Sequence, residues 1–188
     1  MVKCLEEEGV TRIFGYPGVA ISPFYEALYN AGTIEHVLVR QEQAAGHAAS
    51  GYARISRKAA VCVTSSGPGA TNLITALATA YADSIPLIAI TGQVNSNLLG
   101  RDVFQEADMR GSTESFVKYS YLVKSADDIP RIFKEAFYIA STGRKGPVLV
   151  DVPKDAPMSD WKIRELPPVP EGAPIAKLLQ AMQEGRTE

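Results

Sequence analysis

The chain is poor in the residues that form crosslinks and metal sites. It contains only two cysteines and two histidines among 188 residues. Cys4 and Cys62 do not have CxxC spacing, and Cys62 lies inside an apolar run, so the sequence predicts neither a disulfide framework nor a zinc site. His36 and His47 are not accompanied by a pattern of cysteines or acids, and no metal site is predicted in this chain.

An excess of charge of one sign and long apolar runs are also absent. The 19 basic and 21 acidic residues leave a net charge of −2 without a basic block, so we expect no nucleic-acid partner. No run of about 18 apolar residues occurs, which argues against a transmembrane helix. The first eight residues lack the apolar core of a signal peptide, and we therefore expect a cytoplasmic or organelle-matrix protein.

Short apolar runs alternate with longer helix-like segments. Strand-like runs occupy residues 11–15, 35–39, 59–64, 86–91 and 147–152, with 121–123 as a candidate edge strand. Helical patterns occupy residues 22–30, 41–55, 69–82 and 127–141, and the polar stretch 92–115 has room for one helical turn. Strands that are apolar throughout indicate burial on both faces, and intervening helices indicate right-handed crossovers. We predict a doubly wound, mostly parallel α/β sheet with helices on both faces over residues 1–155.

The composition changes near the end of this domain. Six prolines crowd into a short stretch that can be neither helix nor central strand, namely Pro153, Pro157, Pro167, Pro168, Pro170 and Pro174. We predict a proline-rich linker over residues 156–188, in which residues 173–183 begin a helix that belongs to a following domain.

Ligands in open α/β sheets bind in the loops that follow the strands. The Gly67-Pro68-Gly69 turn invites a phosphate-binding interpretation, but Asn72 replaces the third glycine of the dinucleotide fingerprint and Pro68 has no N–H. A tight strand-to-helix turn is the favoured interpretation. The Gly-Lys-Ser/Thr of a P-loop and the Gly-x-Ser-x-Gly of a nucleophile elbow are both absent.

Glu42 opens a helix in which small residues cover nearly every face. By itself, an acid in a first helical turn is commonly a solvated partner of the helix dipole. Gly46 and Gly51 each lower helix propensity by about 1 kcal/mol relative to alanine, a loss that close packing, as against a second subunit, would offset. Glu42 would then lie at a dry interface, where a carboxyl group can move protons.

Several motifs occur together in one order: Phe-Gly-Tyr-Pro-Gly at 14–18, Arg-Gln-Glu-Gln at 40–43, Gly-Tyr-Ala-Arg at 51–54, Thr-Ser-Ser-Gly-Pro-Gly-Ala-Thr-Asn at 64–72, Thr-Gly-Gln-Val at 91–94, Phe-Gln-Glu at 104–106 and Gly-Pro-Val-Leu-Val-Asp-Val-Pro-Lys-Asp at 146–155. Over about residues 5–155 this order resembles the N-terminal pyrimidine-binding domain of the thiamine diphosphate enzymes. The Phe-Gln-Glu and Pro-Lys-Asp motifs are most similar to those of the acetolactate (acetohydroxyacid) synthases.

The resemblance implies a function and a set of site residues. Glu42 would hydrogen-bond N1′ of the aminopyrimidine of thiamine diphosphate and so promote formation of the ylide that attacks pyruvate, and Gln105 would approach the reacting intermediate. Pyruvate would be joined to a second 2-ketoacid, as in branched-chain amino acid biosynthesis. The remaining implied cofactor contacts are Tyr16, Pro17, Gly18, Ser65, Pro68 and Asn72 for thiamine diphosphate, and Arg144 for FAD, unless Arg144 is a solvated cation at a helix end.

Two departures from the family pattern bear on this prediction. Val19 replaces the last glycine of Gly-Tyr-Pro-Gly-Gly, and a β-branched residue there would be strained if the backbone required a positive φ. The Gly-Asp-Gly motif, which in the family binds Mg²⁺ and the diphosphate in a separate domain, does not occur. We therefore expect a fragment, a split subunit or a degenerate gene product that is inactive alone and works in a homodimer or homotetramer. A related thiamine enzyme with another substrate, or a non-catalytic assembly module, remains an alternative.

Overall fold

The computed structural model of the chain describes residues 1–156. Apart from Ala156, the predicted proline-rich linker and the helix after it lie outside the described residues. The predicted domain boundary at residue 155 therefore remains a prediction.

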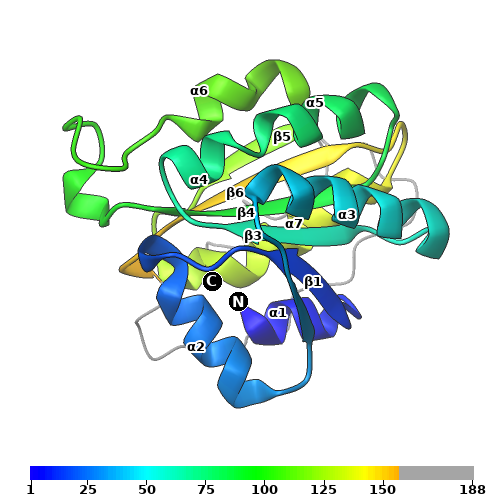
Figure 1. The fold of residues 1–188 in the computed structure, drawn as a ribbon, viewed down its shortest axis with the longest axis horizontal. Coiled ribbons are helices and arrows are strands. Elements are labelled where there is room, and N and C mark those ends of the chain that lie inside the picture. The colour runs from blue at the N-terminus through cyan, green and yellow to red at the C-terminus, as the bar shows by residue number, and fades with distance from the viewer. Residues whose placement is uncertain (157–188) are drawn as a thin grey trace, which may run out of the picture.

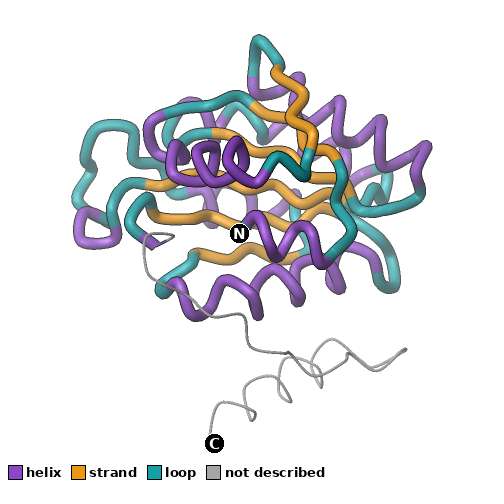
Figure 2. Tube along the Cα trace, turned by 90° about the horizontal axis from the view of Figure 1, so that it is seen from below, coloured by secondary structure: helices purple, strands orange, loops and turns teal. Residues whose placement is uncertain are grey.

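The described strands form one twisted sheet in which every pairing is parallel (Figures 1 and 2). Their bounds are β1 Arg12–Gly15, β2 Glu35–Leu38, β3 Ala60–Thr64, β4 Leu87–Gln93, β5 Tyr119–Leu122 and β6 Pro147–Pro153. The order across the sheet is β2-β1-β3-β4-β6-β5, so the predicted doubly wound sheet is confirmed and is parallel throughout residues 1–156.

Helices cover both faces of this sheet (Figure 1). The α-helices are α1 Val2–Glu7, α2 Ser22–Ala31, α3 Glu42–Ser56, α4 Pro68–Thr71, α5 Ile74–Ala82, α6 Met109–Thr113 and α7 Ile129–Ser141. Single 3-10 turns occur at η1 Val19–Ile21, η2 Ser96–Leu98, η3 Glu114–Phe116 and η4 Ala126–Asp128. Helices α1, α2 and α7 pack on one face, and α3 to α6 pack on the other.

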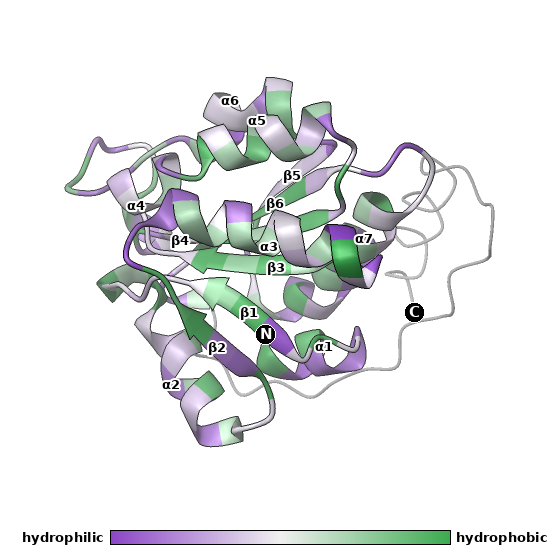
Figure 3. Cartoon of the chain, turned by 45° about the vertical axis from the view of Figure 1, so that its right-hand side comes forward, coloured by the Kyte–Doolittle hydropathy of each residue, from purple (hydrophilic) through white to green (hydrophobic). Residues whose placement is uncertain are grey.

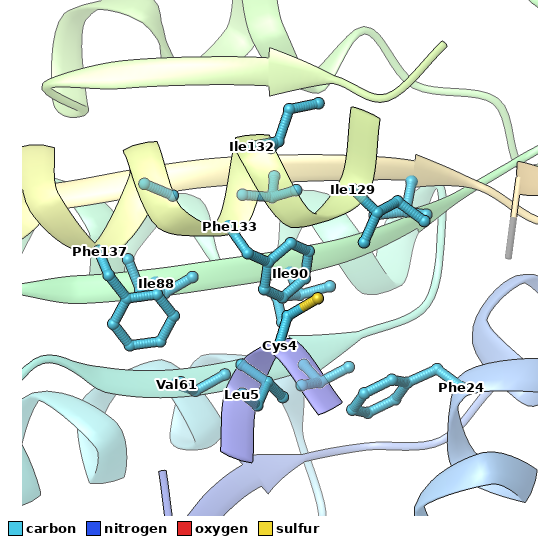
Figure 4. Close-up of a cluster of buried hydrophobic side chains, with 14 of the residues drawn as sticks. Cys4, Leu5, Phe24, Val61, Ile88, Ile90, Ile129, Ile132, Phe133 and Phe137 are labelled. Carbon is cyan, nitrogen blue, oxygen red and sulfur yellow. The ribbon is translucent and has the colours of Figure 1, made fainter. Parts of the chain in front are cut away.

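Alternate residues of the inner strands divide the core into two clusters, because successive side chains of a strand point to opposite faces. Ile88 and Ile90 of β4 join the cluster under α1, α2 and α7, where Phe133 of α7 is fully buried (Figure 4). Leu87 and Ala89 of the same strand join the cluster under α3 and α5. The inner strands β3, β4 and β6 are buried on both faces, and Figure 3 shows β3 as a hydrophobic band.

Three elements differ from the sequence-based expectation. The helix predicted over residues 69–82 is two helices, α4 and α5, with Asn72 and Leu73 between them. Helix α1 was not predicted, because its six residues are too few to show a helical period, although Leu5 is fully buried. Strand β2 is an exposed edge and not a strand buried on both faces, because among the strands of residues 1–156 it pairs only with β1.

The connections create a switch point between two neighbouring strands. From β1 the chain crosses through α2 on one face of the sheet, whereas from β3 it crosses through α4 and α5 on the other. Loops that leave adjacent strands in opposite directions open a crevice at the carboxyl ends of those strands. The loops after β1 and β3 therefore delimit the place where a ligand is expected.

Candidate functional site

The loops that follow β1 and β3 meet directly at this crevice. The Tyr16 amide donates a hydrogen bond to the Val63 carbonyl at 3.1 Å, which continues the pairing of β1 with β3 beyond its last residue. A Cβ atom added at Gly18 would overlap the Ser65 side chain. Only a glycine at position 18 allows the two loops to approach this closely. The approach places the segment 16–18 beside Ser65, and all four of these residues are predicted to bind the cofactor.

Glu42 begins α3 just beyond the end of β2, and its side chain is half-buried. Its Oε2 accepts a hydrogen bond from Asn72 Nδ2 at 2.9 Å. Its Oε1 lies 3.3 Å from the position that a Cβ atom would take at Gly69. The structure thus brings Glu42, Asn72 and the turn containing Pro68 together, although 30 residues separate Glu42 from Asn72 in the chain.

Gln105 reaches the same crevice through its backbone. A Cβ atom at Gly67 would lie 2.7 Å from the Gln105 carbonyl oxygen, so only a glycine at position 67 permits this contact. Gly67 has φ +56°, and Gln105 itself has φ +60°, a backbone conformation that residues other than glycine rarely adopt. The segment 94–108 therefore lies against the turn that follows β3, with Phe104 88% exposed beside it.

Exposed apolar side chains border this edge of the sheet. They come from three different loops and strand ends, namely Tyr16, Val19, Leu38 and Phe104. Val19 is 71% exposed and is not among the residues with positive φ, because it begins the 3-10 turn η1. The backbone strain considered for Val19 is therefore absent, and its side chain enlarges the apolar border.

Arg144 does not join this group of residues. It lies in the loop before the amino-terminal end of β6, whereas Glu42 follows the carboxyl end of β2. Its guanidinium donates to Ser84 Oγ at 3.0 Å and to the Tyr81 carbonyl at 3.2 Å, and it lies over the Tyr81 ring. Arg144 thus caps the carboxyl end of α5, and its assignment as an FAD contact remains a prediction.

The small residues of α3 pack within the chain. A Cβ atom at Gly46 would lie 2.5 Å from the Ala76 Cβ of α5, whereas nothing lies within 4 Å of such an atom at Gly51. The close approach that we expected against a second subunit is therefore made at Gly46 by α5 of the same chain, because the crossover after β3 places α5 beside α3.

A buried polar group near the carboxyl ends of β4 and β6 was not predicted from the sequence. Thr91 and Gln93 of β4 and Asp151 of β6 are at most 3% exposed. Burial raises the pKa of Asp151 to about 7, against the opposing effect of its hydrogen bonds from Thr91 and Gln93. The available signal was a polar residue near the end of each otherwise apolar strand.

Two other features are absent from residues 1–156, namely a cluster of metal-ligating side chains and a membrane-spanning helix. No group of three or more histidine, cysteine, aspartate or glutamate side chains could hold a metal ion there. Within the same range, no helix is long and apolar enough to cross a membrane.

Known proteins match the chain over most of its length. Residues 1–112 match the family model described as thiamine pyrophosphate enzyme, N-terminal TPP binding domain. The acetolactate synthase large subunit of Haemophilus influenzae is 55% identical over 162 residues, which cover 86% of this chain and 28% of that protein. An acetolactate synthase of Mycobacterium bovis is 57% identical over 155 residues, covering 82% of this chain and 25% of that protein.

A third relative matches a similar share of the chain. A probable acetolactate synthase large subunit of Methanocaldococcus jannaschii is 53% identical over 167 residues, covering 89% of this chain and 28% of that protein. The chain thus spans about a quarter of the length of the curated relatives that it matches. Since the family model covers more than half of the chain, this protein belongs to the thiamine pyrophosphate enzymes, whose N-terminal TPP-binding domain it contains.

Proposed function

We propose that the chain supplies the pyrimidine-binding part of a thiamine diphosphate-dependent acetolactate synthase. Such an enzyme decarboxylates pyruvate and joins the remaining two-carbon unit to a second 2-ketoacid, as in branched-chain amino acid biosynthesis. The observation that carries this proposal is the Glu42 carboxyl group, held by Asn72 at the switch point of the sheet. The similarity to acetolactate synthases supports it.

The residues around Glu42 fit the pyrimidine end of the cofactor. Gly69 leaves open the space beside Oε1 that a Cβ atom would crowd, and Asn72 directs the other carboxylate oxygen. Thiamine diphosphate, when bound, supplies a thiazolium ring that acts as nucleophile and as electron sink for decarboxylation. Glu42 would hold and move a proton at the N1′ atom of the pyrimidine ring, a role that needs a group able both to donate and to accept.

The other predicted residues have subsidiary parts in this proposal. Tyr16, Pro17, Gly18, Ser65 and Pro68 would contact the cofactor, because they belong to the two loops that meet beside Glu42. Gln105 would face the substrate from the segment that lies against Gly67.

We extend the proposal to the remaining cofactors and to the assembly. Mg²⁺ would be held with the diphosphate by a separate domain, and FAD would bind near Arg144. The exposed apolar border of Tyr16, Val19, Leu38 and Phe104 supports a site that a second copy of the chain completes, in a cytoplasmic homodimer or homotetramer. A partner there would shield the Glu42 carboxyl group from water, which strengthens its interaction with a bound ring.

The test is the variant Glu42→Gln in an intact synthase that carries this domain. Glutamine keeps the size of the side chain and removes its ability to exchange a proton. We expect pyruvate-dependent acetolactate formation to fall by about 10²- to 10⁴-fold, the usual contribution of general acid–base catalysis. Glu26→Gln, an exposed acid on α2, is the matched control. Full activity of Glu42→Gln would refute the proposed role.

A further inference from the structure

The strongest unexplained feature is a hydrogen-bonded polar group inside the sheet. Thr91 and Asp151 are register partners on β4 and β6, and Gln93 lies two residues farther along β4 on the same face. Thr91 Oγ1 donates to Asp151 Oδ1 at 2.6 Å, and Gln93 Nε2 donates to Asp151 Oδ2 at 3.0 Å. Aspartate is rarely buried to this degree unless its hydrogen bonds are satisfied, so the strand ends are built around this contact.

Gln93 connects this group to the loop that follows β4. Its Nε2 also donates to the Ala107 carbonyl at 2.8 Å, and its Oε1 accepts from the Val94 amide at 2.9 Å. One buried side chain therefore binds the first residue of the segment 94–108 and a residue near its end. Asp151 holds the Gln93 amide in the orientation that allows both contacts, because it accepts the second N–H of that amide.

The segment is closed on itself between these two anchors. The Glu106 carboxylate accepts hydrogen bonds from the backbone amides of Gly100 and Val103. The backbone of Gln105 then lies against Gly67, in the turn that follows β3. Ser96 also donates from its backbone amide and its hydroxyl to Asp155, at 2.9 and 2.6 Å, just beyond the end of β6. Gln93, by contrast, binds both ends of the segment from inside the sheet, and Gln105 makes the contact with the crevice.

We propose that Asp151, acting through Gln93, is the positioning residue that holds the segment 94–108, and with it Gln105, against the turn that follows β3. The consequence for catalysis rests on the proposed function, in which Gln105 faces the substrate. The attachment of the segment does not depend on that function and can be tested in the chain itself.

The test compares two substitutions of nearly equal size, Asp151→Asn and Asp151→Leu. An asparagine can turn its amide so that its oxygen accepts from Gln93 and its nitrogen donates to Thr91 Oγ1. Leucine fills the same space but leaves the Thr91 hydroxyl and one N–H of the Gln93 amide without the acceptor that Asp151 provides. A residue that only fills space would tolerate both changes equally, whereas a positioning residue is rescued by asparagine alone.

The readout is chymotrypsin cleavage of the full chain after Phe104, which is 88% exposed and precedes Gln105 directly. Cleavage after Tyr29 of α2, which is 87% exposed, serves as the internal reference for general unfolding. Val150→Ala is the control variant, because this buried neighbour on β6 points to the opposite face of the sheet.

We expect the Phe104-to-Tyr29 cleavage ratio to rise about tenfold in Asp151→Leu, as expected when a buried polar group loses its hydrogen-bond partner. In Asp151→Asn and Val150→Ala the ratio should stay within about twofold of wild type. An unchanged ratio in Asp151→Leu, or an equal rise in Asp151→Asn or Val150→Ala, would overturn the proposal. If circular dichroism shows that Asp151→Leu does not fold, Gln93→Met is used in its place. The same rise in the cleavage ratio is expected for Gln93→Met, and an unchanged ratio in that variant would also overturn the proposal.

The two proposals fail in different ways. Full activity of Glu42→Gln would refute the proposed function and leave the cleavage ratios as they are. Unchanged cleavage ratios would refute the attachment through Asp151, whatever the activity of Glu42→Gln.

Discussion

Two glycines of α3 allow a direct comparison of helix propensity with packing. Alanine favours a helix over glycine by about 1 kcal/mol. Nothing lies within 4 Å of a Cβ atom at Gly51, so Gly51→Ala should raise the free energy of unfolding by roughly 0.5–1 kcal/mol. At Gly46 the same atom would lie 2.5 Å from the Ala76 Cβ, well inside the contact distance of about 3.5–4.0 Å between carbon atoms.

The net effect at Gly46 follows from two opposing contributions. Overpacking in a core costs typically about 1–3 kcal/mol, which exceeds the gain in propensity, so Gly46→Ala should lower the free energy of unfolding by about 1 kcal/mol. Helices α3 and α5 would have to separate, or Ala76 would have to move. The measurement is urea unfolding of the chain, followed by circular dichroism, for wild type and both variants.

A double variant identifies the cause of the loss. Ala76→Gly removes the methyl group that the new Cβ would meet, so Gly46→Ala with Ala76→Gly should be close to wild type, with a favourable coupling energy of about 1–2 kcal/mol. The Leu73 Cδ2 atom, 3.3 Å from the new Cβ, can shift by side-chain rotation. If Gly46→Ala stabilises the chain as much as Gly51→Ala does, the reasoning from close helix packing is wrong.

Two further predictions concern half-buried side chains, Lys118 and His36. The Lys118 ammonium donates to two backbone carbonyls at the end of α7, so Lys118→Met should lower the free energy of unfolding by about 1–3 kcal/mol. Lys124 is exposed, and Lys124→Met should leave the free energy of unfolding unchanged. Equal free energies of unfolding for the two variants, measured in urea, would contradict this prediction. Burial lowers the pKa of His36 below 6.5, against the opposing effect of its hydrogen bond with the Gly15 carbonyl. The folded state therefore favours the neutral imidazole. The stability that this preference contributes is present above pH 6.5 and is lost as the pH falls through the folded-state pKa of His36. His36→Gln should therefore lose less stability than wild type between pH 7.5 and 5, with the exposed His47→Gln as control, and equal losses for His36→Gln and wild type would refute this.

The order of strands and helices could be predicted because hydrophobic burial repeats along the chain. Strands β3, β4 and β6 each begin with a run of four apolar residues, and α7 places Ile129, Ile132, Phe133 and Phe137 on one buried face. The position of Glu42 at the start of a helix beyond a strand also followed from local pattern, and the structure places it there. These features depend on neighbours in the chain, whose spacing the sequence contains directly.

Contacts between distant segments could not be predicted in this way. Three contacts depend on which strands are neighbours: that of Glu42 with Asn72, that of Gly46 with Ala76, and that of Arg144 with the end of α5. Local periodicity contains no information on strand order, so it does not identify α5 as the element that packs against Gly46.

The sequence by itself thus determined the fold class, the location of the buried strands and the chemical groups available at their carboxyl ends. Only the tertiary structure decided which of those groups meet. Parallel pairing of β4 with β6 places Thr91 beside Asp151, 60 residues farther along the chain. The carboxyl group of Asp151 satisfies its hydrogen bonds only after β4 and β6 have paired, because both of its partners, Thr91 and Gln93, lie on β4.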